Sequence, residues 1–231
     1  MLNTLSARAT FYDIIGYFVP GLLTLGVGLV CMRILGGQPL IDNVYGWTND
    51  HWFATSIIGV VLSYIAGHCA NSCSSWLLEK IIFKDQFAEA ANWYKRLLDK
   101  SPEREKVIKS VVKAELNIDM SKLEPFDLMI RMEEFFPRAT ISGFSFLCFY
   151  GMCRTLALLS WLAALPISIL LGTMWSGDTI EKVVAGVVAS VIMCAVGSLF
   201  FNQYIRFVRY YYDFLASTLM FFIGKKKNKL P

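Results

Sequence analysis

A polar face interrupts one of the most apolar stretches of the chain, in the segment SYIAGHCANSCSSWLLEK at 63–80. His68, Asn71, Ser72 and Ser75 recur there at spacings of three and four, so a helix would place them on one face. The imidazole of His68 can change its charge near neutral pH, and polar side chains inside a membrane helix are costly and often functional. The face therefore fits a pore-lining or gating position, or a set of hydrogen bonds between packed helices.

Polar groups also stand at the matching ends of the other apolar stretches. Asp13 opens the first, Arg154 opens the third, and Asn202 and Gln203 close the fourth. Two interpretations stay open: a polar vestibule with Asp13 or His68 near Arg154, or helix ends that are polar because water lies there. The complete candidate polar and gating cluster consists of Asp13, His68, Asn71, Arg154, Asn202 and Gln203.

Neither a metal site nor a catalytic set is expected from the residue spacing. Cys69 and Cys73 lie about one helical turn apart beside His68, but tetrahedral metal sites usually take four ligands and no second pair follows at matching spacing. As base and nucleophile, His68 and Cys69 would face about 100° apart on a helix, which is poor geometry. The sequence contains no P-loop and no dinucleotide fingerprint. We therefore expect neither a cofactor nor an enzyme activity.

The composition of the chain is that of a membrane protein. Of 231 residues, 55% are hydrophobic and 17% are charged, and the mean hydropathy is +0.49. Soluble domains have about a quarter charged residues, so the composition disfavours a soluble globular chain, and it also disfavours a disordered one. Four stretches are long and apolar enough to cross a bilayer as helices, at 14–34, 53–74, 155–175 and 183–204. We expect an all-α membrane protein with four transmembrane helices in two hairpins.

Lysine and arginine are distributed unevenly between the connecting segments. The loop 36–52 contains none, whereas 79–140 contains twelve, together with twelve acidic residues. Because positive charge favours the cytoplasmic side, we expect both termini and 79–140 to be cytoplasmic. The predicted organisation is a transmembrane hairpin at 1–78, a helical cytoplasmic segment at 79–140, an interfacial helix and second hairpin at 141–204, and a cytoplasmic or surface helix with a basic tail at 205–231.

Two stretches next to the second hairpin allow more than one interpretation. Residues 141–153 and the third span together exceed one crossing, so we expect an interfacial helix that turns into the membrane near Arg154. Residues 205–223 could form a fifth span, but this would place Arg209 and Asp213 in lipid. We expect the fourth helix to continue instead along the surface or into the cytoplasm. Its polar stripe consists of Arg206, Arg209, Asp213 and Ser217.

Small residues give the fourth span a face that allows close packing. Gly186, Ser190, Cys194 and Gly197 recur there at spacings of four, four and three. Such a face suits packing within the bundle, and it also suits contact between copies of the chain, which would make the protein a homo-oligomer. In the first span, Gly16 and the Pro20-Gly21 pair would kink or loosen the helix.

The basic tail of the chain predicts contact with anionic lipid headgroups, or serves only to fix the topology. Its cationic residues are Lys225, Lys226, Lys227 and Lys229. Nucleic-acid binding is not expected, because no basic patch interleaved with aromatic residues occurs in a plausible domain.

Three segments together resemble a set of small bacterial inner-membrane proteins: FYDIIGYFVPGLL at 11–23, the segment at 63–80, and YGMCRTLALL at 150–159. In that set a Y-D-x-x-G-Y-x-x-P-G opening, a Gly-His pair in the second span and an arginine at the third span recur. The build is similar to that of membrane components of antiviral defence systems, such as the Kiwa membrane protein and the membrane accessories of CRISPR systems. The positions that match are Asp13, Gly67, His68 and Arg154.

The resemblance implies an oligomeric protein of the bacterial inner membrane. It would act as a sensor or membrane-permeabilising effector in antiviral defence, triggered through its cytoplasmic part by a soluble partner protein. An alternative is a non-conducting membrane scaffold that anchors a cytoplasmic partner enzyme through residues 79–140. In that case His68 and Arg154 would only hold helices together.

Overall fold

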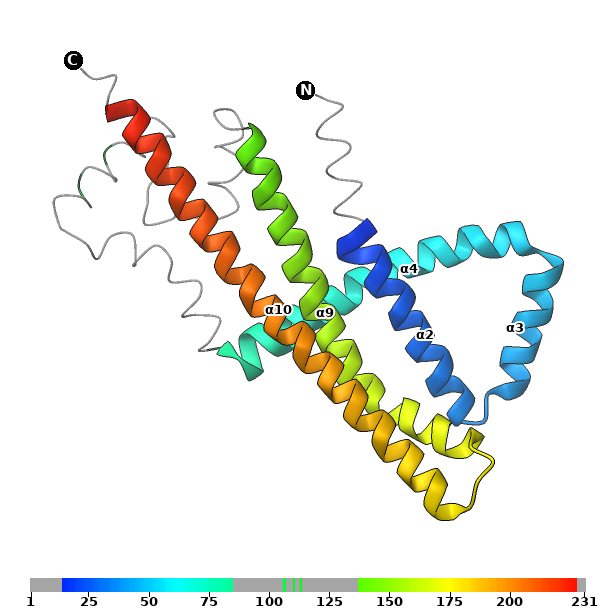
Figure 1. The fold of residues 1–231 in the computed structure, drawn as a ribbon. Helices are drawn as coiled ribbons and strands as arrows, with labels where there is room; N and C mark the ends of the chain where they lie inside the picture. The colour runs from blue at the N-terminus through cyan, green and yellow to red at the C-terminus, as the bar shows by residue number, and fades with distance from the viewer. Residues whose placement is uncertain (1–13, 85–105, 107–109, 111–112, 114–136, 228–231) are drawn as a thin grey trace. The chain divides into compact units, whose positions relative to one another are not determined.

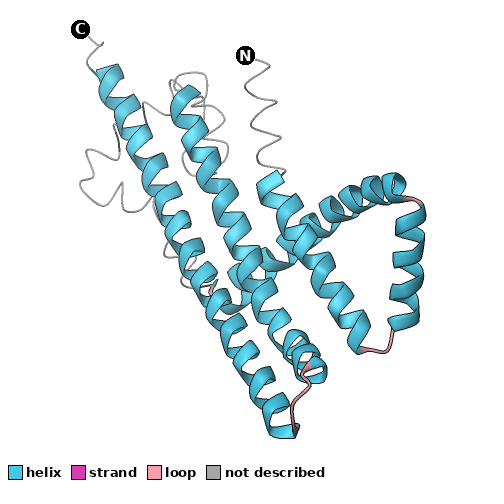
Figure 2. Cartoon of the chain, turned by 45° about the vertical axis from the view of Figure 1, so that its right-hand side comes forward, coloured by secondary structure: helices cyan, strands magenta, loops and turns pink. Residues whose placement is uncertain are grey.

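The computed structural model describes residues 14–84, 106, 110, 113 and 137–227, and in these residues the chain is helical without strands (Figure 1, Figure 2). Two short π-helical segments flank the α-helices of the first half, since η1 precedes α2 and η2 follows α4. In chain order the elements are η1 Ile14–Phe18, α2 Val19–Ile34, α3 Gln38–Asp50, α4 Trp52–Ser74, η2 Ser75–Ile82, α9 Pro137–Met174 and α10 Thr179–Lys227.

Four helical stretches are long and apolar enough to cross a membrane, which confirms the prediction of an all-α, multi-pass membrane protein. Between 11% and 33% of the most apolar window of each stretch is buried within the chain. The remaining apolar surface therefore has to be covered by lipid or by other protein chains. The four stretches are Ile14–Ile34, Trp52–Ile82, Ser142–Met174 and Thr179–Phe221.

Helix α9 is continuous, and this corrects the prediction of a separate interfacial helix. The backbone stays helical through Arg154, so the expected turn into the membrane at that residue is absent. The reason lies in the local sequence, because no proline separates 141–153 from the third span and the first one reached is Pro166. Helix α10 also continues without a break to Lys227, as the sequence predicts for the fourth span.

The connection between the first two spans is helical, whereas the sequence predicted a loop at 36–52. Gly36 has a φ of 84° and makes the turn after α2, a conformation that favours glycine. Helix α3 then begins at Gln38 with Pro39 in its first turn, where a missing N–H is tolerated. Most of the predicted cytoplasmic segment 79–140 lies outside the described residues.

The chain divides into two compact units, and each has its own packing. The first comprises Met1–Ile82 and Cys148–Tyr204, and the second comprises Phe83–Leu147 and Ile205–Pro231. In the second unit, Tyr211 and Leu215 are buried, and Phe144, Phe146 and Leu147 are among the residues that pack against them. The predicted polar stripe at 206, 209, 213 and 217 is exposed, so this part of α10 is amphipathic.

Glycines bring the first two spans into backbone contact in the first unit. Gly21 of α2 faces the carbonyl group of Ser63, and Gly67 of α4 faces the carbonyl group of Tyr17, so a Cβ at either glycine would overlap main-chain atoms. Pro20 is the second residue of α2, which follows η1 directly. Its ring would crowd the carbonyl of Gly16 four residues earlier, which accounts for the wider π-helical turn before it.

Small residues of α10 pack against α9 in the same unit, where the two helices lie side by side (Figure 1, Figure 2). Gly186 lies against the Ser168 carbonyl, the hydroxyls of Ser190 and Ser168 are hydrogen-bonded, and Gly197 lies against the Trp161 indole. Cys194, the fourth member of the predicted face, is exposed. Three of the four small residues therefore pack within the chain, as one of the two interpretations of this face predicts.

Replacing Gly21 by leucine should destabilise the crossing of α2 and α4, because the new Cβ would meet main-chain atoms that cannot rotate away. We expect the free energy of unfolding to fall by about 1–3 kcal/mol, the usual effect of overpacking. The measurement is thermal unfolding of the purified protein in detergent. Gly26→Leu in the same helix is the matched control, because nothing lies within 4 Å of its Cβ position. Equal midpoints for the two variants would contradict this crossing.

Candidate functional site

A buried ion pair joins helix α9 to the π-helical segment η2. The guanidinium of Arg154 donates a hydrogen bond to the carboxylate of Glu79, and the two side chains are only 5% and 11% exposed. Each charge alone would be strongly disfavoured away from water, and the pair satisfies both. Arg154 was predicted from the sequence as a site residue, whereas Glu79 was not.

The other nitrogens of Arg154 are bound by helix α4. Its Nη2 donates to the Asn71 side-chain Oδ1 at 2.7 Å and to the Asn71 carbonyl at 3.2 Å, and its Nε donates to the Ser74 hydroxyl at 3.2 Å. The guanidinium carbon lies 5.6 Å from the centre of the Tyr150 ring, within the range of a cation–π contact. Arg154 is therefore held on several sides by acceptors and by an aromatic ring.

Glu79 is held in turn by two hydroxyl groups. Tyr204 of α10 donates to Oε1 at 3.1 Å, and Ser75, one turn earlier in η2, donates to Oε2 at 2.6 Å. The Tyr204 ring is 1% exposed, so α10 contributes its hydroxyl from a fixed position. The ion pair consequently ties together side chains from three membrane-crossing stretches.

Thr155 completes the network between α9 and α4. Its hydroxyl lies 3.1 Å from the Ser74 hydroxyl and 3.2 Å from Asn71 Oδ1, and it also bonds the Gly151 carbonyl at 3.0 Å. We refer to the whole set as the Arg154 cluster. Its members are Asn71, Ser74, Ser75, Glu79, Tyr150, Arg154, Thr155 and Tyr204.

The cluster lies at one end of the membrane-crossing helices. About 30 Å of α9 separates Arg154 from Met174, and about 37 Å of α10 separates Tyr204 from Thr179, at about 1.5 Å per residue. Each length is enough to cross a hydrocarbon core about 30 Å thick. A crossing that begins at the α9–α10 turn would therefore end near the cluster.

The backbone is unusual at the point where the charges are buried. Ser75 and Glu79 belong to η2, and π-helical turns are rare and often lie at functional sites. Asn71, Ser75 and Glu79 follow each other at spacings of four, so the polar face seen in the sequence extends into η2. This spacing could have identified Glu79 as a site residue. The many charged residues that follow it in the sequence favoured assigning it to the cytoplasmic segment instead.

Only two residues of the predicted polar cluster come together, namely Asn71 and Arg154. His68 instead stacks on the Tyr17 ring, with centroids 3.7 Å apart and planes 14° apart, and it meets the edge of Tyr64 at 4.5 Å. Asn202 and Gln203 are exposed on α10. In the described residues, therefore, these groups do not form the predicted vestibule around Arg154, and Asp13 lies outside the described residues.

The remaining site predictions concern metal binding and lipid contact. In the described part of the chain, no group of three or more His, Cys, Asp or Glu side chains could hold a metal ion, and the cysteines there are free. The tail residues cannot be placed against lipid, because the side chains of Lys225, Lys226 and Lys227 and the whole of Lys229 lie outside the described part.

Every buried side-chain nitrogen and oxygen of the described residues has a hydrogen-bond partner. The Arg154 cluster thus holds helices together and presents neither a free base nor an activated nucleophile in the form seen. No protein-family model, curated protein or solved structure matches the chain. What the protein does has therefore to be inferred from the cluster and its position in the fold.

Replacing Arg154 by methionine should leave the Glu79 carboxylate buried without its partner. We expect the free energy of unfolding to fall by about 3–5 kcal/mol, and Glu79→Met should act similarly through the unpaired guanidinium. The double variant should lose less than the sum of the two single variants, because it leaves no unpaired charge. Chemical unfolding in detergent measures these effects, with the exposed Arg206→Met as control. Additive losses would show that the two side chains do not act as a pair.

The surroundings of His68 predict that its ring matters more than its charge. His68→Phe should keep the stack on Tyr17 and retain the wild-type unfolding midpoint, whereas His68→Ala should lose about 0.5–1.5 kcal/mol of aromatic contact. Thermal unfolding in detergent compares the two variants. A phenylalanine variant as unstable as the alanine variant would indicate that the imidazole nitrogens are required.

Proposed function

We propose that the protein is a membrane switch of the bacterial inner membrane, acting as a sensor or membrane-permeabilising effector in antiviral defence. The observation that carries the proposal is the buried Arg154–Glu79 pair, which ties three membrane-crossing stretches together at one edge of the bilayer. The resemblance of three sequence segments to membrane components of defence systems supports the biological setting. Both termini are then cytoplasmic, as the distribution of lysine and arginine predicts.

The cluster suits a switch because a small displacement of its helices would break the ion pair. Moving η2 relative to α9 would separate Glu79 from Arg154 and leave two charges without partners, so intermediate positions are unfavourable. A packed element with two discrete arrangements is the usual basis of an all-or-none response. The resting state would be the paired arrangement, and triggering would exchange the pair for contacts with water or other groups.

The position of Glu79 connects the cluster to the cytoplasmic part of the chain. Glu79 lies three residues before the end of η2 at Ile82, and the segment predicted to be cytoplasmic follows directly. A soluble partner protein that binds this segment could therefore displace η2. The apolar surface left uncovered on the four stretches leaves room for contact between copies of the chain in the membrane.

A non-conducting scaffold is the second candidate function, and one observation favours it. All described buried polar side-chain atoms are already paired, which is also what a permanent clamp between helices would require. In this case the protein would anchor a cytoplasmic enzyme through residues 79–140, and the Arg154 cluster would only maintain the fold.

Glu79→Gln should weaken the switch because it removes the charge. The amide oxygen can still accept hydrogen bonds from Arg154 and Tyr204, whereas the amide nitrogen cannot accept the one from Ser75. In cells that express the protein we expect this variant to lower the membrane potential without a trigger, as reported by a potential-sensitive dye. Asp42→Asn, which removes an exposed carboxylate in α3, is the control and should match the wild type. An unchanged potential for Glu79→Gln at wild-type protein levels, both before and after phage infection, would overturn the effector proposal and favour the scaffold.

A further inference from the structure

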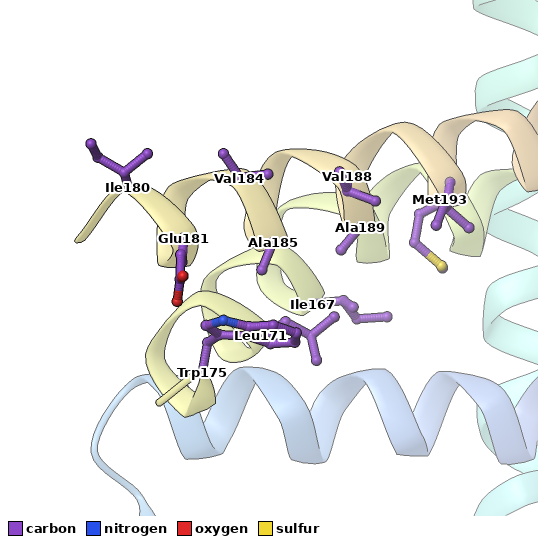
Figure 3. Close-up of a pocket in the computed structure, with 11 residues that line it drawn as sticks. Ile167, Leu171, Trp175, Ile180, Glu181, Val184, Ala185, Val188, Ala189 and Met193 are labelled. Atoms are coloured by element: carbon purple, nitrogen blue, oxygen red, sulfur yellow. The ribbon is translucent and has the colours of Figure 1, made fainter. Parts of the chain in front are cut away.

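An apolar groove of about 680 Å³ follows helices α9 and α10 from their connecting turn (Figure 3). The short side chains of Ala185 and Ala189 leave space between the two helices. Leu171 of α9 and Val188 of α10 are among the larger apolar residues that border this space. All of these residues belong to the first compact unit and lie at the end of the helices opposite the Arg154 cluster.

We propose that the groove binds one acyl chain of an amino-phospholipid, whose ammonium group lies against Glu181 and Trp175. The length of the groove fits this occupant. Its lining covers about 20 Å of α10, from Ile180 to Met193, and about 12 Å of α9, from Ile167 to Trp175, at about 1.5 Å per residue. One leaflet of a hydrocarbon core about 30 Å thick measures about 15 Å, which lies between these two lengths and fits an acyl chain.

The mouth of the groove carries a negative charge beside an aromatic ring. The Glu181 side chain projects from the first turn of α10 toward Trp175, which ends the lining on the α9 side (Figure 3). Both side chains are exposed, and tryptophan favours the membrane interface, so the mouth lies at headgroup level. A carboxylate attracts a cationic headgroup and repels an anionic one, and an indole face adds a cation–π contact.

The chemistry of the mouth distinguishes among phospholipids. A primary ammonium group offers three N–H donors to the Glu181 carboxylate, whereas a quaternary choline offers none. A phosphatidylglycerol headgroup has no cation at all and brings a negative charge toward Glu181. This proposal does not rest on the switch function, because the groove and the Arg154 cluster share no residue.

The test is native mass spectrometry of the full-length protein in detergent with phosphatidylethanolamine, phosphatidylcholine and phosphatidylglycerol of identical acyl chains. We expect phosphatidylethanolamine to be retained about fivefold better than either other lipid, because only its ammonium group can both pair with the Glu181 carboxylate and donate hydrogen bonds to it. Glu181→Gln should abolish this preference. Asp178→Asn removes a neighbouring carboxylate that does not line the groove, retains an acceptor for the Glu181 N–H, and should keep the preference.

A second pair of variants tests the acyl chain. Ala185→Leu should fill the groove and reduce retention of phosphatidylethanolamine to the level of the other two lipids, whereas Ala195→Leu, on the exposed surface of the same helix outside the groove, should not. Equal retention of the three lipids by the wild type, or a preference that survives Glu181→Gln, would overturn the proposal. So would equal effects of the two leucine variants, which would indicate annular lipid only.

Discussion

A guanidinium that leaves water is stable only if the protein surrounds it with hydrogen-bond acceptors and a counter-charge. Arg154 meets this requirement with a carboxylate from η2, an amide and a hydroxyl from α4, and the ring of Tyr150. Because these groups come from separate stretches, their contacts with one guanidinium fix the position of α4 along α9. The hydrogen bond from Tyr204 to Glu79 fixes α10 in the same way. The hydrogen bond between the Ser168 and Ser190 hydroxyls is a further polar contact between α9 and α10.

Small residues allow the helices of the first unit to approach closely in the arrangement that the Arg154 cluster requires. Close approach of α2 to α4 depends on Gly21 and Gly67, and close approach of α10 to α9 depends on Gly186 and Gly197. In lipid, apolar side chains gain little by leaving one hydrocarbon environment for another, so small residues and polar pairs carry the helix contacts. Both π-helical segments adjoin such contacts, since η1 supplies Tyr17 to Gly67 and η2 supplies Glu79 to Arg154.

The sequence was informative about membrane residence and less informative about pairing. Hydropathy predicts the four spans because length and composition alone decide whether a helix can cross. Arg154 and Asn71 were identified by type and position. The spacing of four that links Asn71, Ser75 and Glu79 does not indicate that Glu79 pairs with Arg154, which lies 75 residues away. His68 was identified because its imidazole can act in gating, but in the structure its ring packs against Tyr17 and Tyr64. The sequence pattern alone does not distinguish a packing histidine from a gating one.

The distance along the chain between the two charges also sets the order of events during synthesis. Glu79 is made 75 residues before Arg154, a delay of about 4–15 s at about 5–20 residues per second. Over that interval the first hairpin has to be inserted while its carboxylate is still without its counter-ion. A location at the hydrocarbon edge permits this, since water can hydrate Glu79 until the second hairpin arrives. Biogenesis is thus feasible in two stages, with the ion pair forming as the last step of assembly.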